Sequence, residues 1–246
     1  MSYYSIAKKA SRTIGNHRGL RYIKLQAKTA KSILDVGCGE GTRLNTLLPK
    51  TTPGVGVDIS QSAIKQAKSQ YPRHVYKKYN GKKLPFRGNS FDLVYSAFVL
   101  EHVQDPEKFV QEMVRVVKPN GQLVIICPNY GAPNRRSPNS IENPIKKLIF
   151  GFIKDFIPNH KLTFTKVRPK KTYQQIDDDT TIEPYILTLI QFLKKNNLKI
   201  KKYSSLWELE AKTFNPRKLS FLVLGKLKIF PFKYWGPQIF IAVSKQ

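Results

Sequence analysis

The stretch Ile33-Leu34-Asp35-Val36-Gly37-Cys38-Gly39-Glu40-Gly41 decides the fold of this 246-residue chain. It is a short apolar run that ends in three alternate glycines, and a helical pattern follows from Thr42 to Leu48. Glycines at such a strand-to-helix turn permit positive φ angles and let a ligand approach backbone N–H groups. Because position 42 is threonine, the turn lacks the last glycine of the dinucleotide fingerprint, and it also lacks the Gly-Lys-Ser/Thr of a phosphate loop. A pyrophosphate ligand is therefore disfavoured.

The alternation of strands and helices continues beyond this turn. Strand patterns occur at 54–59, 75–79, 91–95 and 123–127, and helical patterns at 60–70 and 106–118. This order predicts an α/β fold with a mostly parallel sheet and helices on both faces. Asp58 ends the second strand, where a carboxylate can accept hydrogen bonds from ribose hydroxyls. The ligand is therefore expected to be a nucleoside without a pyrophosphate.

The chain after residue 129 has a different character. Pro144 opens an amphipathic helix with Lys146, Lys147, Lys154 and Asp155 opposite an apolar stripe of Ile145, Leu148, Ile149, Phe152, Ile153 and Phe156. A further helix is expected over Thr181 to Asn196, and strands over 199–203 and 239–243. Residues 219–235 interleave large apolar side chains with lysines. These two apolar segments either cover the sheet or an acceptor pocket, or they contact lipid.

Five ordered motifs resemble those of class I S-adenosylmethionine (SAM)-dependent methyltransferases. Residues 33–41 are similar to the first motif of the methyltransferase type 11 group, which includes ubiquinone and menaquinone methyltransferases. The other resembling stretches are 56–60, 84–94, 100–103 and 115–121. The resemblance covers about residues 31–129. It implies a Rossmann-like fold with a seven-stranded, mostly parallel sheet and a helical insert on the acceptor side.

The resemblance also implies roles for individual residues. Asp35 and the turn glycines Gly37, Gly39 and Gly41 would hold the methionine end of SAM. Asp58 would bind both ribose hydroxyls, and Ile59 would lie against the adenine. Asn80 and Gly81 stand where the family often has an acidic residue that reads the adenine amino group. Tyr95 and Ser96 would line the methionine side at the end of the fourth strand.

Methyl transfer from a sulfonium needs alignment above all, and it needs a base only if the nucleophile carries a proton. His102 follows the fourth strand and is the candidate base, unless it only packs beside Glu101. His160 is a weaker candidate that would require the insert to form a lid. No His/Cys/Asp set has metal spacing, so no metal is expected. Asp177 to Asp179 could bind a cation, but a solvated helix start is the preferred interpretation.

We expect a single methyltransferase domain over residues 1–246. It would comprise a basic N-terminal helix (1–30), the cofactor-binding core (31–129), an acceptor or cap region (130–236) and a closing strand (237–246). The chain has no apolar run of the roughly 18 residues that span a bilayer, and its N-terminus does not resemble a signal peptide. A cytoplasmic protein is expected, with peripheral attachment to the inner face of the membrane as an open alternative.

The net charge is +27, from 43 Lys and Arg against 16 Asp and Glu. It is concentrated in the flanks, with +8 in residues 1–31 and +14 in 129–246, against +5 between them. Compositional drift and an anionic partner both explain this charge. The expected activity is methyl transfer to a small-molecule or lipid-linked acceptor, such as a quinone, a glycolipid or a cell-surface sugar. An RNA methyltransferase and a non-catalytic cofactor-binding protein remain the alternatives. RNA is disfavoured because Arg is scarce and no RNA-binding module is recognised.

Overall fold

The computed structural model describes residues 17–157, 161–170, 177–210 and 216–246. Contacts within the chain define two compact units, which are described separately. The first unit comprises residues 1–99, 105–125 and 243–246, and the second comprises residues 100–104 and 126–242. The sequence-based expectation of one domain stays a prediction.

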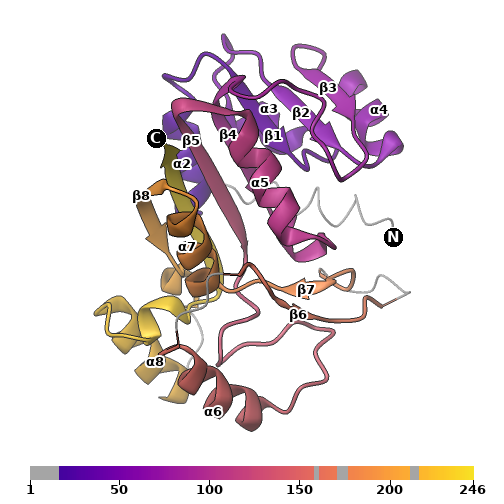
Figure 1. The fold of residues 1–246 in the computed structure, drawn as a ribbon. Coiled ribbons are helices and arrows are strands. Elements are labelled where there is room, and N and C mark those ends of the chain that lie inside the picture. The colour runs from indigo at the N-terminus through magenta and orange to yellow at the C-terminus, as the bar shows by residue number, and fades with distance from the viewer. Residues whose placement is uncertain (1–16, 158–160, 171–176, 211–215) are drawn as a thin grey trace. The chain divides into compact units, whose positions relative to one another are not determined.

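A seven-stranded sheet has the order β3-β2-β1-β4-β5-β9-β8 (Figure 1). Its strands are β1 (Ile33–Val36), β2 (Val55–Asp58), β3 (Val75–Lys78), β4 (Phe91–Ala97), β5 (Val117–Pro128), β8 (Leu198–Ser204) and β9 (Gln238–Lys245). The pairs β1–β2, β1–β4 and β2–β3 are parallel. The strand order reverses beside β1, and such a reversal places a crevice at the carboxyl ends of the central strands. The mostly parallel sheet expected from the sequence is confirmed.

The helices of the first unit begin where the sequence provides caps. They are α2 (Arg18–Gln26), α3 (Thr42–Leu47), α4 (Gln61–Gln70) and α5 (Pro106–Val116). The Ser60 hydroxyl accepts from the N–H of Ala63, and the Asp105 carboxylate accepts from the N–H of Lys108. One face of α5 is buried, through Phe109, Val110, Met113 and Val116. The 3.6-residue pattern in the sequence therefore predicts these helices to within a few residues.

The second unit contains α6 (Pro144–Lys154), α7 (Ile186–Lys195), α8 (Pro216–Lys226) and the short hairpin β6 (Thr165–Lys166) and β7 (Ile182–Glu183). It also contains the 3-10 turns η2 (Leu100–His102), η3 (Trp207–Glu210) and η4 (Phe232–Tyr234). The prediction of one helix from Thr181 to Asn196 is wrong at its start, because residues 182–183 form β7. Pro184 disfavours a helical conformation at Glu183, so α7 begins only at Ile186.

The helix α6 exposes most of its apolar stripe, although Leu148 is half-buried, and it also exposes Lys146 and Lys154. Lys147 is the only one of its residues that is fully buried, and its Nζ donates to the carbonyl of Tyr130 at 2.9 Å and to the carboxylate of Glu183. Asp155, just after the helix, is also buried and accepts from the Tyr185 hydroxyl and from Trp235 Nε1. The apolar stripe therefore faces outward. No helix among the described residues is both long and apolar enough to cross a bilayer.

Candidate active site

The glycine-rich turn joins β1 to α3 in the first unit. Gly37, Gly39 and Gly41 all have positive φ, which side chains other than glycine rarely adopt. A Cβ atom at Gly37 would lie 2.3 Å from a methyl group of Val99, so close packing requires glycine there. A Cβ atom at Gly39 would meet nothing within 4 Å. The turn is thus packed against the protein at Gly37 and open at Gly39.

Asp58, at the end of β2, holds this turn. One of its carboxylate oxygens accepts from the N–H of Gly39 at 2.9 Å, and the other accepts from the N–H of Ser60 at 2.8 Å. Burial raises the pKa of Asp58, although these backbone N–H groups partly oppose the shift. Because each carboxylate oxygen has two lone pairs, both can still accept from a ligand hydroxyl.

Asp35 lies in the interior of the same unit. It is fully buried, and neither carboxylate oxygen accepts a hydrogen bond of good geometry from the part of the chain that the structure describes, although the Tyr95 hydroxyl lies close enough to lower the pKa of Asp35. Burial raises the pKa of Asp35 to about 7, and the nearby Arg43 guanidinium offsets only part of that shift. A buried carboxylate without a hydrogen-bond partner is costly unless a ligand supplies one. Asp35 is therefore suited to bind a cationic or N–H donor group.

The residues expected around the adenine are arranged less simply. Ile59 leaves 62% of its surface exposed, and a Cβ atom at Gly81 would lie 3.4 Å from its Cγ2, so these two positions are neighbours. The side-chain oxygen Oδ1 of Asn80, however, accepts from the backbone N–H groups of Lys82 and Lys83 and so stabilises a turn. The adenine contacts of Ile59, Asn80 and Gly81 stay predictions.

Tyr95 and Ser96, on β4, are both buried. The Ser96 hydroxyl donates to the carbonyl of Val36 at 2.9 Å, which ties β4 to the end of β1. Burial raises the pKa of Tyr95, and the Asp35 carboxylate raises it further. Tyr95 thus lies close to the carboxylate of Asp35, whereas the hydrogen bond of Ser96 stabilises the sheet.

Arg43 and Glu40 are site residues that sequence reasoning did not single out. Arg43 donates to the carbonyl of Ala97 at 2.7 Å and lies 5.3 Å from the centre of the Phe98 ring. Glu40 is buried, and its Oε1 has no hydrogen-bond partner among the described residues. A cation in the first turn of a helix is unfavourable for the helix dipole. The sequence signal that was missed is therefore the position of Arg43, because it is a cation in the first turn of α3.

The candidate base His102 belongs to η2 in the second unit. Its Nε2 lies 3.8 Å from a carboxylate oxygen of the fully buried Glu101, and its Nδ1 lies 3.3 Å from Asp179. Burial disfavours the imidazolium, but these carboxylates outweigh it and raise the pKa of His102. Burial likewise raises the pKa of Glu101, to about 7. His160, the weaker candidate, lies outside the described residues.

A family model described as a methyltransferase domain matches residues 34–125, the part of the chain that contains the glycine turn, Asp35 and Asp58. These residues are a methyltransferase domain. The match begins inside β1 and ends inside β5, so it spans the central strands of the sheet.

Curated relatives match the same part of the chain as the methyltransferase domain model. A probable SAM-dependent methyltransferase of Mycobacterium tuberculosis is 34% identical over 101 residues, which cover 41% of this chain and 37% of that protein. A demethylmenaquinone methyltransferase of Renibacterium salmoninarum is 34% identical over 116 residues, which cover 46% of this chain and 49% of that protein. The chain therefore spans less than half the length of either relative.

Solved structures match nearly the whole chain at low identity. A putative methyltransferase of Bacillus halodurans has a TM-score of 0.57 at 16% identity and covers 93% of this chain and 99% of that one. Geranyl diphosphate C-methyltransferase of Streptomyces coelicolor has a TM-score of 0.56 at 15% identity and covers 92% and 76%. These likenesses show a Rossmann-like methyltransferase fold.

SAM is the cofactor of this domain family, and the residues of the first unit fit it. The buried carboxylate of Asp35 matches a cationic amino group, and the open face at Gly39 leaves room for a ligand, although the N–H groups of Gly37, Gly39 and Gly41 already donate within the protein. Asp58 offers acceptor lone pairs to hydroxyls at the end of the neighbouring strand. The structure therefore has acceptors for the amino group and for the hydroxyls of such a ligand.

Gly39→Ala tests whether the open side of the turn is a ligand surface. We expect at least tenfold weaker SAM binding, because the new methyl group would fill space that the protein itself leaves empty. The positive φ makes alanine unfavourable by about 1–2 kcal/mol. Calorimetric SAM titration and thermal unfolding together check this expectation. If the variant unfolds at a lower temperature but its folded form binds SAM with nearly unchanged affinity, Gly39 does not face the cofactor.

Proposed function

We propose that the chain is a SAM-dependent methyltransferase that transfers a methyl group in line to a small-molecule or lipid-linked acceptor. The observation that carries this proposal is the arrangement of Asp35, Gly39 and Asp58 around one turn. The motifs of the sequence, the matched domain and its curated relatives support it. When bound, SAM supplies an activated methyl group on a sulfonium.

The residues of this chain act by binding and orientation. Asp35 binds the amino group at the methionine end, and Asp58 binds ribose hydroxyls while it also positions the Gly39 N–H. Fixing both ends of the cofactor removes rotational freedom at the methyl donor, and such alignment can contribute several kcal/mol to catalysis. His102 can accept a proton from the acceptor only in its neutral form. Its neighbouring carboxylates raise its pKa and so favour the imidazolium, which cannot act as a base.

A cavity in the second unit supports an acceptor with apolar and anionic parts. It has a volume of about 700 Å³. Its apolar and aromatic lining includes Ile145, Leu148, Trp207 and Phe221, and its polar lining includes Tyr130, Arg135 and Arg136. Guanidinium groups suit carboxylates and phosphates, whereas the aromatic walls suit a ring or an isoprenoid chain. A quinone precursor or a phosphorylated lipid has both features, and one curated relative acts on demethylmenaquinone.

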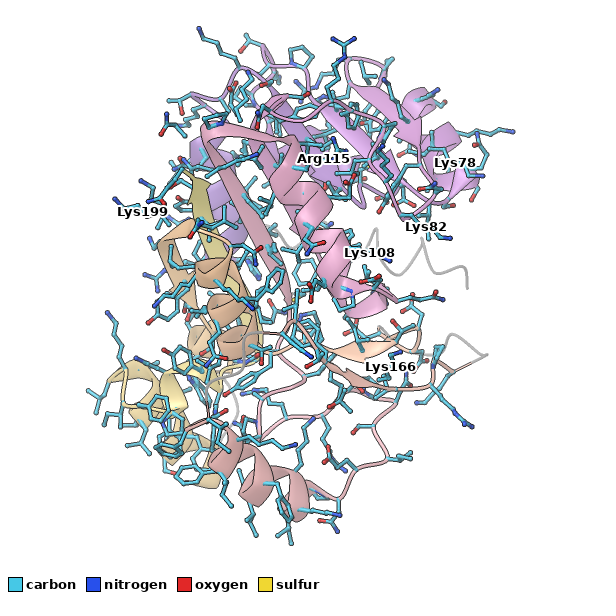
Figure 2. The ribbon with its side chains drawn as sticks, viewed as in Figure 1. Lys78, Lys82, Lys108, Arg115, Lys166 and Lys199 are labelled. Atoms are coloured by element: carbon cyan, nitrogen blue, oxygen red, sulfur yellow. The ribbon has the colours of Figure 1, made fainter. Side chains whose placement is uncertain are left out.

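Transfer of labelled methyl from SAM into separated cell fractions tests the acceptor class. Label in lipid or in small molecules supports the proposal and provides material for mass spectrometry. Label in RNA would instead favour the alternative that the cationic residues follow a phosphate backbone. The labelled basic side chains in Figure 2 come from several different elements, among them β3, α5, β6 and β8. Arg115, one of them, already pairs with Glu112 at 2.7 Å.

We also propose that the protein works in the cytoplasm and attaches reversibly to anionic membranes. The attachment site is the α6–α8 surface, a set of large exposed apolar side chains of the second unit. The rings of Phe156 and Phe230, whose centroids lie 5.0 Å apart, join its two halves. Its members are Ile145, Ile149, Phe150, Phe152, Ile153, Phe156, Ile157, Leu219, Val223, Leu227, Ile229 and Phe230.

The positive charge around this surface favours an anionic membrane as its binding partner. The exposed residues Lys146, Lys154, Lys226 and Lys228 lie on or beside its two helices, whereas Asp155 is buried and hydrogen-bonded inside the unit. Apolar side chains bordered by lysines fit the boundary between acyl chains and anionic headgroups. Buried polar contacts of Lys147 and Asp155 hold α6 with its apolar side outward, so the exposure is built into the fold.

Vesicle sedimentation tests this surface. We expect binding to vesicles with phosphatidylglycerol at low salt, with a loss as salt rises from 0.05 to 0.5 M because the charges are screened. The double variant Phe150→Glu/Ile153→Glu should bind at least tenfold more weakly, since two apolar side chains no longer enter the interface. Leu25→Glu, which changes an equally exposed apolar residue of α2, is the matched control.

Two results would overturn the membrane surface without touching the methyltransferase assignment. One is equal vesicle binding by the double variant and the control. The other is that the chain is a dimer which the double variant converts to a monomer, because the α6–α8 surface would then cover a second copy. Light scattering of the same samples distinguishes that case.

A further inference from the structure

A second cluster of ligating side chains lies in the second unit. Glu101, His102 and Asp177 each offer one ligating atom, and these atoms lie within 4.8 Å of one another. Glu101 and His102 belong to η2, whereas Asp177 comes from the turn that precedes β7. The N–H of Thr181 donates to the carbonyl of Glu101 at 2.9 Å and so fastens that turn to η2. The three ligating groups are thereby brought together from distant parts of the sequence.

The carboxylate of Glu101 is the second observation that points to a bound ion. Its exposure is 0%, and neither oxygen has a hydrogen-bond partner among the described residues. The imidazole Nε2 of His102, at 3.8 Å, is beyond hydrogen-bonding distance. A buried carboxylate is normally paired, hydrogen-bonded or bound to a metal, because its desolvation costs several kcal/mol. Among the described residues, the ion pair of Glu101 with His102 at 3.8 Å is too long for a hydrogen bond, so its lone pairs are available to a cation.

Neighbouring groups orient the other two side chains. The Tyr130 hydroxyl donates to one oxygen of Asp177 at 2.6 Å, which leaves the second oxygen for a ligand. Asp179 lies 3.3 Å from His102 Nδ1, on the opposite side of the ring from Nε2. Metal-binding histidines and carboxylates are commonly held by such outer partners, which set the ring orientation.

The local charge is opposite to that of the whole chain. The sequence has 43 basic and only 16 acidic residues, yet four of the acidic ones, Glu101 and Asp177 to Asp179, occur here. Lys170 forms an ion pair with Asp178, with 3.4 Å between Nζ and Oδ1. Among the described residues, the ion pairs of the other three carboxylates involve only the His102 imidazole, so at least two negative charges are left without a cation there if all three are ionised. A divalent cation would balance them.

We propose that Glu101, His102 and Asp177 bind one divalent transition-metal cation. Two carboxylate oxygens and an imidazole nitrogen favour Mn²⁺, Fe²⁺ or Zn²⁺, whereas Mg²⁺ and Ca²⁺ prefer oxygen ligands alone. Metal–ligand bonds of about 2.1 Å place ligating atoms at most about 4.2 Å apart, so the group must close by roughly half an ångström. Asp177 also lines the 700 Å³ cavity, which provides an entry path and room for a further ligand. This site revises the expectation of no metal.

Titration of the metal-free full-length chain with Mn²⁺ tests the proposal. Free Mn²⁺ has a sharp electron paramagnetic resonance spectrum that is lost on binding, so the stoichiometry can be counted without an activity assay. We expect one equivalent to bind, with an accompanying rise in the unfolding temperature. Glu101→Gln and Asp177→Asn should each weaken binding by at least tenfold, and Zn²⁺ should displace Mn²⁺.

Two carboxylates at the start of α5 provide matched controls, since Asp105→Asn, at the exposed N-cap, and Glu107→Gln, at a half-buried position in the first turn, remove the same charge elsewhere. Asp177→Asn guards against misfolding of the buried Glu101 variant, and retained SAM binding confirms an intact first unit. No binding at 1 mM Mn²⁺, or stoichiometric binding that both ligand variants retain, would falsify the site. Either failure leaves the cofactor-binding part of the proposed function standing, because that part rests on Asp35, Gly39 and Asp58 of the first unit, whereas a metal bound by His102 would compete with its role as a base.

Discussion

Replacement of Asp58 by alanine is expected to weaken SAM binding by at least about 150-fold. In the proposed function the carboxylate has two tasks, because it binds ribose hydroxyls in addition to accepting from the N–H of Gly39 in the turn. A hydrogen bond to a charged group contributes about 1.5–3 kcal/mol, so the loss of two such bonds costs about 3 kcal/mol or more. Isothermal titration calorimetry measures the change directly.

Asp92→Asn is the matched control for that prediction. Asp92 is also a hydrogen-bonded carboxylate of the first unit, and it accepts from the N–H of Ser32 at 2.8 Å and from Lys118 Nζ at 2.9 Å. It lies at the start of β4, whereas Asp58 lies at the end of β2. The control should lower the unfolding temperature and leave SAM affinity within about twofold, because ligands bind at the carboxyl ends of parallel strands. Equal loss of affinity in both variants would mean that Asp58 matters only for stability.

The second large effect concerns Asp35 and pH. Burial raises its pKa to about 7, and in the proposed function its carboxylate binds the amino group of SAM. Below pH 7 the group is mostly protonated, so affinity should fall about tenfold between pH 8 and pH 6. The effect on folding has the opposite sign. A raised carboxyl pKa stabilises the folded state at low pH, and that contribution is lost as the pH rises toward 7.

Asp35→Asn separates this group from other titrations. The amide keeps the size of the side chain but loses its charge, so SAM affinity should fall about tenfold or more at pH 8. The variant should also lose most of the dependence on pH between 6 and 8. A variant that keeps the pH dependence of the natural chain would assign that dependence to another group and contradict the role of Asp35.

Local patterns in the sequence predict most of the first unit. The apolar run before Gly37 becomes β1, and Ser60 and Pro106 stand at the starts of α4 and α5 as expected. These features depend on interactions between residues a few positions apart, which a sequence displays directly. The turn glycines are also predictable, because their backbone conformation is a local property. The cofactor class followed from the same local motifs.

The second unit was harder to predict, because its decisive interactions are distant in the sequence. The amphipathic pattern of α6 was recognised, but which side would be buried depends on Glu183 and Tyr130, far away in the chain. A pattern of spacing identifies the two faces of a helix, and it contains no information about buried ion pairs that form elsewhere. The start of α7 was missed for a simpler reason, because Pro184 was not weighed against the helical pattern.

The site shows the same division. Sequence alone determined the parallel α/β core, the glycine turn and the carboxylates at Asp35 and Asp58, since each lies in a short motif at a strand end. Only the tertiary structure decided that Asp35 has no hydrogen-bond partner among the described residues, and that Asp58 already supports Gly39. It likewise brought Asp177 to Glu101 and His102 and turned the apolar side of α6 outward. The physical reason is that burial and partnership are properties of the folded neighbourhood, whereas motif spacing is a property of the chain.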